Sequence, residues 1–285
     1  MTVKSAALLC ALTLIAWAKP AYAAKSYDQC QYYVDTVPMV ITTPGIWCLR
    51  KDLVVIGPAP NSAINIQASN TTLDCKDFAI DGTAIAPLEA QWAIVSDQQH
   101  DLTVRNCNIR GFLYGISVYN TTSKGNSVIN NRIAKSYGGG IQVVGDGSVV
   151  RGNFILDSGN GGDGNPACGI SVWGSVDVID NLIHGVSATN TNVCGISANE
   201  FSGHIIGNRV RGLSAGIVSN PSVAISLVSA INAVVRDNDI SGEGLPITAG
   251  MWCRSATGRL KGNVVKGMQT PLMECDLGQD NDVSY

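Results

Sequence analysis

One short motif, V-x-x-N-x-I with close variants, recurs through most of the 285-residue chain and constrains its fold more than any other feature. Its asparagine falls at six positions that lie 22 to 30 residues apart, namely Asn131, Asn153, Asn181, Asn208, Asn238 and Asn263. Cys107 fills the same slot one copy earlier. Between copies the chain carries a Gly-rich turn and a second short run, G-I-x-V, with no helical periodicity. A period in the twenties made of β-branched runs and turns indicates an all-β solenoid.

The repeat extends over residues 62–277 and predicts about eight to nine coils in one domain. Residues 24–61 contain two strand-like runs around Pro44-Gly45 but lack the repeat. We expect this segment to cap the first coil, because the end of a solenoid exposes apolar side chains and unpaired strand edges. Residues 278–285 form a polar C-terminal tail that we expect to fray.

The N-terminus has the pattern of an export signal. Residues 1–23 combine Lys4, an apolar run too short to span a bilayer, and Ala21-Tyr22-Ala23 as an A-x-A cleavage site. An uncleaved membrane anchor is the alternative, which the length and flanks of the run favour less. We therefore expect a secreted or periplasmic protein with no membrane span in the mature chain. No basic stripe or cluster occurs, so nothing predicts nucleic-acid binding.

Cysteine usage agrees with export. Of the nine cysteines only Cys10 lies in the expected signal, which leaves eight. An even number in an exported chain favours disulfides, and without C-x-x-C or H-x-x-x-H no structural zinc is expected. The sequence leaves the connectivity open, but sequential pairing is favoured: Cys30–Cys48, Cys75–Cys107, Cys168–Cys194 and Cys253–Cys275.

Over residues 62–276 the chain resembles the right-handed parallel β-helix proteins of the pectate-lyase-like superfamily. Each coil in that family has three short strands, and an asparagine often marks the turn between the second and third, which V-x-x-N-x-I matches. The resemblance implies a ladder of stacked asparagines at a tight corner, where this residue tolerates a left-handed backbone and its amide can bond along the axis. It also implies a ligand groove over the first strand of each coil, here G-I-x-V.

The outward positions of that first strand are the candidate ligand-binding residues. One column is expected to run from Asn65 through several serines to Trp252 and Glu274. Binding roles are predicted for five residues on this face: Asp97, Tyr119, Trp173, Asn199 and Trp252. Flat rings beside polar groups suit the apolar faces and hydroxyls of sugars. The alternative is that these rings only pack beneath neighbouring loops, and that the serines only solvate the sheet.

Five residues are the candidates for acid–base chemistry: Asp157, Asp163, Glu200, Arg254 and Glu274. A hydrolase would need two carboxylates about 5–10 Å apart across a glycosidic bond. A lyase would need a base together with carboxylates or Ca²⁺ to neutralise a uronate, so Ca²⁺ is the one cofactor to expect, and only in that case. The plain structural alternative is that the acids are turn residues and that Arg254 pairs with an acid of the next coil.

The catalytic motifs of known enzymes in this superfamily are missing. Instead of the Gly-His-Gly of polygalacturonase-like members, the chain has Gly203-His204-Ile205, and the Asp-Pro-His of alginate epimerases is absent. No catalytic residue is therefore carried over by the resemblance. The sequence predicts an exported protein that engages a polysaccharide or cell-envelope glycan, cleaving it as a lyase or hydrolase. The alternative is a non-catalytic carbohydrate-binding or structural β-helix at the cell surface.

Overall fold

The computed structural model describes residues 30–56, 61–85, 92–159, 166–215, 222–242, 249–275 and 280–284. Contacts divide the chain into two units, Met1–Cys30 and Gln31–Tyr285, and every described strand belongs to the second. The expected export signal, residues 1–23, lies outside the described part. Those described ranges contain strands, turns and bends but no helix, and hence no helix that could cross a membrane.

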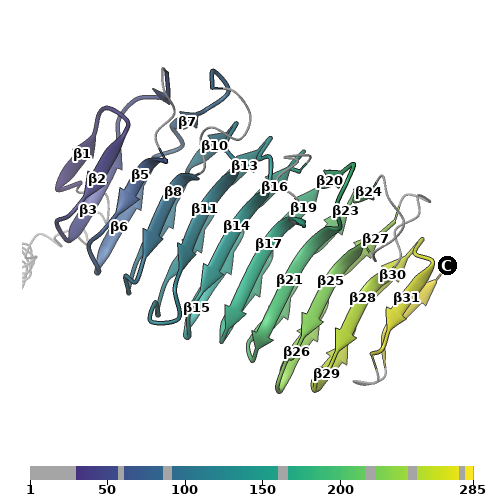
Figure 1. The fold of residues 1–285 in the computed structure, drawn as a ribbon. Coiled ribbons are helices and arrows are strands. Elements are labelled where there is room, and N and C mark those ends of the chain that lie inside the picture. Colours follow the sequence, from purple (N-terminus) through teal and green to yellow (C-terminus); the bar gives the residue numbers. More distant parts are fainter. Residues whose placement is uncertain are drawn as a thin grey trace, which may run out of the picture. The chain divides into compact units, whose positions relative to one another are not determined.

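Three parallel ten-stranded sheets, which we name A, B and C, form the solenoid (Figure 1). Sheet B contains β2 (Met39–Ile41), β5 (Ser62–Ile66), β8 (Trp92–Asp97), β11 (Tyr114–Tyr119), β14 (Gly139–Val144), β17 (Ala167–Gly174), β21 (Val193–Phe201), β25 (Val223–Val228), β28 (Ala249–Arg254) and β31 (Thr270–Met273). Sheet A contains β1 (Tyr32–Val34), β3 (Gly45–Leu49), β6 (Thr71–Asp74), β9 (Thr103–Arg105), β12 (Ser127–Ile129), β15 (Ser148–Arg151), β18 (Val176–Ile179), β22 (His204–Ile206), β26 (Ala233–Arg236) and β29 (Gly258–Lys261). Sheet C contains β4 (Leu53–Val54), β7 (Ala79–Asp81), β10 (Asn108–Arg110), β13 (Arg132–Ala134), β16 (Phe154–Leu156), β19 (Leu182–His184), β23 (Arg209–Arg211), β27 (Asp239–Ser241), β30 (Val264–Lys266) and β32 (Asp282–Ser284).

Each coil passes through sheets B, A and C in that order, so the parallel β-solenoid predicted from the repeat is confirmed. A short pair, β20 (Ser187–Ala188) with β24 (Ser214–Ala215), joins two of the loops that lead from sheet C back to sheet B.

Both ends of the described chain add strands to the three sheets. Residues 39–54, expected to lie outside the repeat, supply β2, β3 and β4, one strand to each sheet, while β1 pairs along the outer edge of β3. At the other end, β32 pairs with β30, so the polar tail adds a strand to sheet C.

Branched aliphatic side chains from all three sheets fill the core. In the coil made by β17, β18 and β19, the side chains of Ile170, Val172, Val178 and Ile183 are completely buried. Burial of each such side chain contributes about 1.5–3 kcal/mol relative to exposure. Because every coil repeats this arrangement, hydrophobic stabilisation is spread along the axis.

The glycine of G-I-x-V is explained by the same core. A Cβ added to Gly195 would lie 2.4 Å from Val210 Cγ1 in sheet C and 2.6 Å from the carbonyl oxygen of Ala224 in the next coil. The corner between sheets C and B therefore admits only small residues. In the other strands from β5 to β28 the equivalent slot holds glycine or alanine: Ala63, Ala93, Gly115, Gly140, Gly169, Ala224 and Gly250.

A continuous ladder of buried asparagine amides occupies the corner between sheets A and C. Asn153 Nδ2 donates to Asn181 Oδ1 and to the Val128 carbonyl, both at 2.9 Å. Its Oδ1 accepts from the backbone N–H of Asn131 at 2.9 Å and from Asn131 Nδ2 at 3.0 Å. The pattern continues through Asn208, Asn238 and Asn263 and ends on Asn281, a rung not identified from the sequence. Each amide is thus satisfied inside the core, and the ladder fixes how the coils stack.

At this corner the residue before each ladder asparagine has the left-handed backbone. The expectation that the asparagine itself would have it was wrong. The φ of the preceding residue is 54° at Asp180, 57° at Asp237 and 66° at Gly207. From residue 130 onward this slot alternates strictly between Asn or Asp and Gly: Asn130, Gly152, Asp180, Gly207, Asp237, Gly262, Asp280. A Cβ added to Gly207 would lie 2.4 Å from Asp180 Oδ1, so each acidic or amide side chain fills the space above the next coil.

Disulfides join neighbouring coils. Cys75–Cys107, Cys168–Cys194 and Cys253–Cys275 are bonded in the pairing favoured from the sequence, and Cys30 and Cys48 are also disulfide-bonded. Cys168 and Cys194 are register partners on the outer face of sheet B. Four disulfides are typical of a protein outside the reducing cytosol.

Candidate functional site

The outer face of sheet B carries the polar and aromatic side chains that the sequence singled out. Its middle column follows the strand register as Asn65, Val95, Ser117, Gln142, Ser171, Ser197, Ser226, Trp252 and Met273. The expected column therefore holds for every coil except the last. There Met273, not Glu274, pairs with Trp252, because Leu272 takes the inward slot beside Met251. Glu274 instead lies exposed in the turn after β31, with φ 53°.

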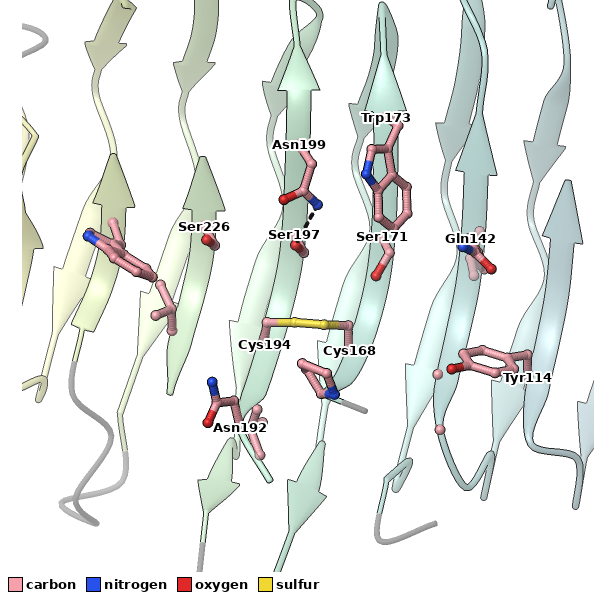
Figure 2. A pocket seen from close by; sticks show the side chains of 17 residues that line it. Tyr114, Gln142, Cys168, Ser171, Trp173, Asn192, Cys194, Ser197, Asn199 and Ser226 are labelled. Carbon is pink, nitrogen blue, oxygen red and sulfur yellow. Dashed lines mark hydrogen bonds between the residues drawn. A yellow bond between two sulfur atoms is a disulfide. The ribbon is translucent and has the colours of Figure 1, made fainter. Parts of the chain in front are cut away.

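A hollow of about 460 Å³ lies over this face between β11 and β28, and we name it hollow I. Serine hydroxyls form its floor, with Ser171 and Ser197 on neighbouring strands, and Trp173 and Asn199 lie beyond them (Figure 2). Asn199 Nδ2 donates to Ser197 Oγ at 3.1 Å, which orients the amide over the floor. The Cys168–Cys194 disulfide crosses the same floor and ties its two central strands together (Figure 2).

Trp252 lines hollow I and offers an unused donor. Its indole Nε1 is buried and has no hydrogen-bond partner among the described residues. Buried indole N–H groups usually find an acceptor, so this one is available to a ligand oxygen. The guanidinium of Arg254 lies 5.8 Å from the centre of the Trp252 ring and covers one of its sides.

Hollow I is uncharged. Its lining residues are aromatic, aliphatic, hydroxyl, amide and disulfide groups, and none of those described is Asp, Glu, Lys, Arg or His. A ligand here would meet hydrogen-bonding groups and flat rings without a formal charge. That composition suits a neutral polyol better than a carboxylated one.

A second hollow of about 560 Å³, hollow II, lies over β5, β8 and β11 on the same face. The rings of Trp92 and Tyr119 line it with their centres 6.4 Å apart and their planes 25° apart. Asp97 is the register partner of Tyr119 on the adjacent strand and lies exposed at its rim. Burial, and then the negative charge of Asp97, raise the pKa of Tyr119.

The described acid–base candidates lie at both ends of the sheet B strands. Asp157 is exposed at the corner where sheet C leads into sheet B, with φ 47°, whereas Glu200 is exposed at the opposite end of the sheet B strands, with φ 46°. Arg254 is exposed at the end of β28. Asp163 lies outside the described residues. The left-handed backbones of Asp157 and Glu274 fit turn residues, whereas Glu200 is the unpaired residue of a bulge in β21. Their catalytic roles stay predictions.

Metal binding has no support in the described ranges, where no group of three His, Cys, Asp or Glu side chains is arranged to hold an ion.

Two aromatic residues of the site were missed by the sequence reading. Tyr114 lines hollow I and Trp92 lines hollow II, and the two are register partners. Each immediately precedes the small residue of the G-I-x-V slot, at an outward position left out of the two columns considered. The aromatic residue shared by W-A-I and Y-G-I was the signal that could have found them.

No family model and no curated protein matches the chain. Among solved structures it is similar to the catalytic domain of a GH87 α-1,3-glucanase in complex with nigerose, at 14% identity and a TM-score of 0.37, over 88% of this chain and 52% of that one. It is also similar to the A-module of the Azotobacter vinelandii mannuronan C-5 epimerase AlgE6, at 13% identity, TM-score 0.43, and 90% and 91% coverage. A third is PfbA, a surface adhesin of Streptococcus pneumoniae, at 10% identity, TM-score 0.36, and 89% and 83% coverage. The chain spans about half the length of the first of these, and the likeness concerns the fold.

Proposed function

We propose that the outer face of sheet B binds a polysaccharide, and that hollow I receives its uncharged sugar units. The observation that carries this proposal is the composition of hollow I, where indole rings, serine hydroxyls and carboxamides line one concave surface and no Asp, Glu, Lys, Arg or His is among the described lining residues. Indoles stack on the apolar faces of pyranose rings, while hydroxyls and amides exchange hydrogen bonds with sugar hydroxyls.

The repeat suits a polymer better than a single sugar. Adjacent strands in a sheet are about 4.8 Å apart, close to the length of one sugar unit. A glycan running across the strands would therefore meet a new set of polar groups at each coil. The serine column (Ser171, Ser197, Ser226) supplies such a set on three consecutive strands.

Binding without cleavage is the form that we favour. A glycoside hydrolase needs two carboxylates about 5–10 Å apart around the bond, and hollow I offers none among its described residues. A lyase needs a base that is deprotonated near neutral pH. The raised pKa of Tyr119 opposes that role for its hydroxyl.

The test replaces the stacking rings and measures both affinity and turnover. Trp173→Ala and Trp252→Ala should each weaken binding to a neutral glycan at least tenfold, a loss of about 1.4 kcal/mol. Phe154→Ala is the matched control, because this exposed aromatic lies on sheet C and should leave the affinity unchanged. Unaltered affinity in both tryptophan variants would overturn the proposal.

The same glycan panel is assayed for new reducing ends and for the ultraviolet absorbance of unsaturated products. Absence of both signals alongside measurable binding is the expected result. Release of either product would instead establish a hydrolase or lyase, and Asp157→Asn and Glu200→Gln would then test the residues predicted to act.

We also propose that the chain is exported and meets this glycan outside the cell or in the cell envelope. The four disulfides and the signal-like residues 1–23 support this. Mass spectrometry of the protein from its native host should give a mature chain that lacks the first 23 residues. A full-length cytosolic chain with free thiols would contradict the idea.

A further inference from the structure

Hollow II differs from hollow I in its chemistry, although both lie on the outer face of sheet B. The two share no lining residue. Among the described residues that line hollow II, the ionisable side chains are Asp97 and Tyr119, and no cation is present. This part of the face therefore has one negative charge, where hollow I has none.

The Asp97 carboxylate lacks a cationic partner. Its Oδ1 accepts a hydrogen bond from Asn120 Nδ2 at 3.2 Å, and Oδ2 has no hydrogen-bond or ion-pair partner in the described part of the chain. Two more deeply buried carboxylates of the early coils do have cationic partners, since Asp74 pairs with Arg105 and Asp81 with Arg110. An acid left unpaired in a hollow is free to bind a cation from outside.

Aromatic rings lie beside that carboxylate. Tyr119 and Asp97 are paired across neighbouring strands, and the Tyr119 ring stacks with Trp92. The raised pKa of Tyr119 has burial as its first cause and the charge of Asp97 as its second, so the hydroxyl experiences a negative field. An ammonium group over such a ring is attracted both by the π face and by the acid.

The remaining polar groups divide into fixed and available ones. Gln99 is held in place, because its Oε1 accepts from Ser69 Oγ at 3.0 Å and its Nε2 donates to the Asp97 carbonyl at 3.1 Å. The side-chain amides of Asn65, Gln67 and Gln98 also line the hollow and make no hydrogen bond to the described residues. Those three amides are available to form hydrogen bonds with the hydroxyl groups of a sugar whose amino group contacts Asp97.

We propose that hollow II binds the free amino group of a hexosamine unit, so that the glycan held by this face carries unacetylated amino sugars. This assignment rests on the proposed function and names the substrate class. Asp97 receives the ammonium, the Trp92–Tyr119 pair receives the apolar face of the ring, and the adjoining coils with hollow I receive uncharged units of the same chain.

The experiment compares two probes of equal length, a hexamer of N-acetylglucosamine and a hexamer of glucosamine, by calorimetry at low and moderate salt. The wild-type protein should prefer the glucosamine hexamer at least tenfold, and the preference should shrink as salt rises. Asp97→Asn should abolish the preference by lowering the affinity for the glucosamine hexamer. Asp239→Asn, the same charge change on sheet C, is the control and should keep the preference.

Equal affinity of the wild-type protein for the two hexamers would overturn the assignment, as would a preference that survives Asp97→Asn. A lysine-rich peptide that displaces the glucosamine hexamer and binds more tightly would also overturn it, by showing that the occupant is a peptide. Failure of the broader proposal is distinguishable, because Trp173→Ala would then leave acetylated-hexamer binding unchanged. With Trp173 and Trp252 both replaced by Ala, no indole of hollow I remains, and quenching by glucosamine that is lost on a further Trp92→Phe change reports on hollow II.

Discussion

At the scale of single residues, the ladder asparagines combine a buried position with full hydrogen bonding. Asn181 Nδ2 donates to Asn208 Oδ1 at 2.9 Å and to the Val150 carbonyl at 3.0 Å, while its Oδ1 accepts from Asn153. One side chain thus links three coils. A buried polar group without its partner costs about 1–3 kcal/mol, so loss of one rung leaves several such groups at once.

Asn181→Ala should therefore lower the free energy of unfolding by about 3 kcal/mol or more, because it strands the Asn153 amide and the Val150 carbonyl inside the core. Denaturant titration followed by circular dichroism measures the change. Asn190→Ala, at an exposed loop position, is the control and should alter stability by less than about 0.5 kcal/mol. A comparable small effect at Asn181 would mean that the ladder does not stabilise the stack.

Asp74 gives the fold a specific pH dependence. The residue is 1% exposed, and burial alone would raise the pKa of its carboxyl, yet the Lys76 N–H, the Asn106 amide and the Arg105 charge together hold that pKa below its usual value. The folded-state pKa is thus depressed, so the stabilisation is present above the unfolded value of about 3.9 and is lost as pH falls through the folded value.

Asp74→Asn should consequently destabilise the protein by about 2 kcal/mol at pH 7, and the difference in unfolding free energy between variant and wild type should shrink as pH falls below the unfolded pKa of about 3.9. Thermal or urea unfolding of both proteins across this pH range measures the gap. A gap that stays constant down to pH 2 would show that the loss comes from packing, not from the charge.

The residue scale also shows where sequence reasoning succeeds. Spacing alone located six ladder asparagines, since a buried amide must recur once per coil. It assigned the left-handed backbone to the wrong residue. The residue before each ladder asparagine has the positive φ, but it is Asn, Asp or Gly in different coils, so no single residue type marks it. Spacing also missed Asn281, whose coil is cut short and lacks the flanking aliphatic pattern.

At the scale of the strands, the small residue before each inward isoleucine determines how closely sheet C approaches sheet B. Gly195→Ala should destabilise by about 1–3 kcal/mol, because its Cβ would overlap Val210 and the next coil's backbone. The double variant with Val210→Ala should lose less than the sum of the two single changes, as relief of one contact couples the sites. If the stability losses of the two single variants simply add, the added Cβ clashes with the backbone of the next coil and not with Val210.

Strand register was predictable for most of sheet B, because alternation fixes which side chains face outward once the inward isoleucine is known. The shift at Glu274 arose in the last coil, where Thr270–Met273 has no G-I-x-V motif to set the phase. The positions of the acid–base candidates were not predictable for a different reason. Their placement depends on which end of a strand each loop joins, and short turn segments carry no periodic signal of that.

At the scale of the whole molecule, disulfides add cross-links between coils that already share sheets. Replacing Cys168 and Cys194 together by alanine should cost about 3 kcal/mol on a loop-closure estimate for a separation of 26 residues. Reduction of the wild-type protein should lower its denaturation midpoint further, since all four bridges open. If reduction left the midpoint unchanged, the hydrogen-bonded stack alone would account for the stability.

The two hollows could not be derived from the sequence, because each is lined by side chains from several coils and depends on loop positions as well as strand faces. The sequence did place Trp173, Asn199 and Trp252 on the face where hollow I lies, and Asp97 and Tyr119 where hollow II lies. The sequence did not predict that hollow I would be uncharged, or that hollow II would contain a single unpaired acid.

The alternation at the left-handed corner limits how the solenoid can change its length. Between residues 130 and 280 each Gly is overlaid by an Asn or Asp of the preceding coil. Excising one coil from this range would bring two Asn or Asp residues, or two glycines, into direct succession, as Asn106 and Asn130 already are in the coils before it. Excising two coils leaves the alternation unchanged. Within this range the length that can be added or removed while the alternation is kept is therefore a pair of turns.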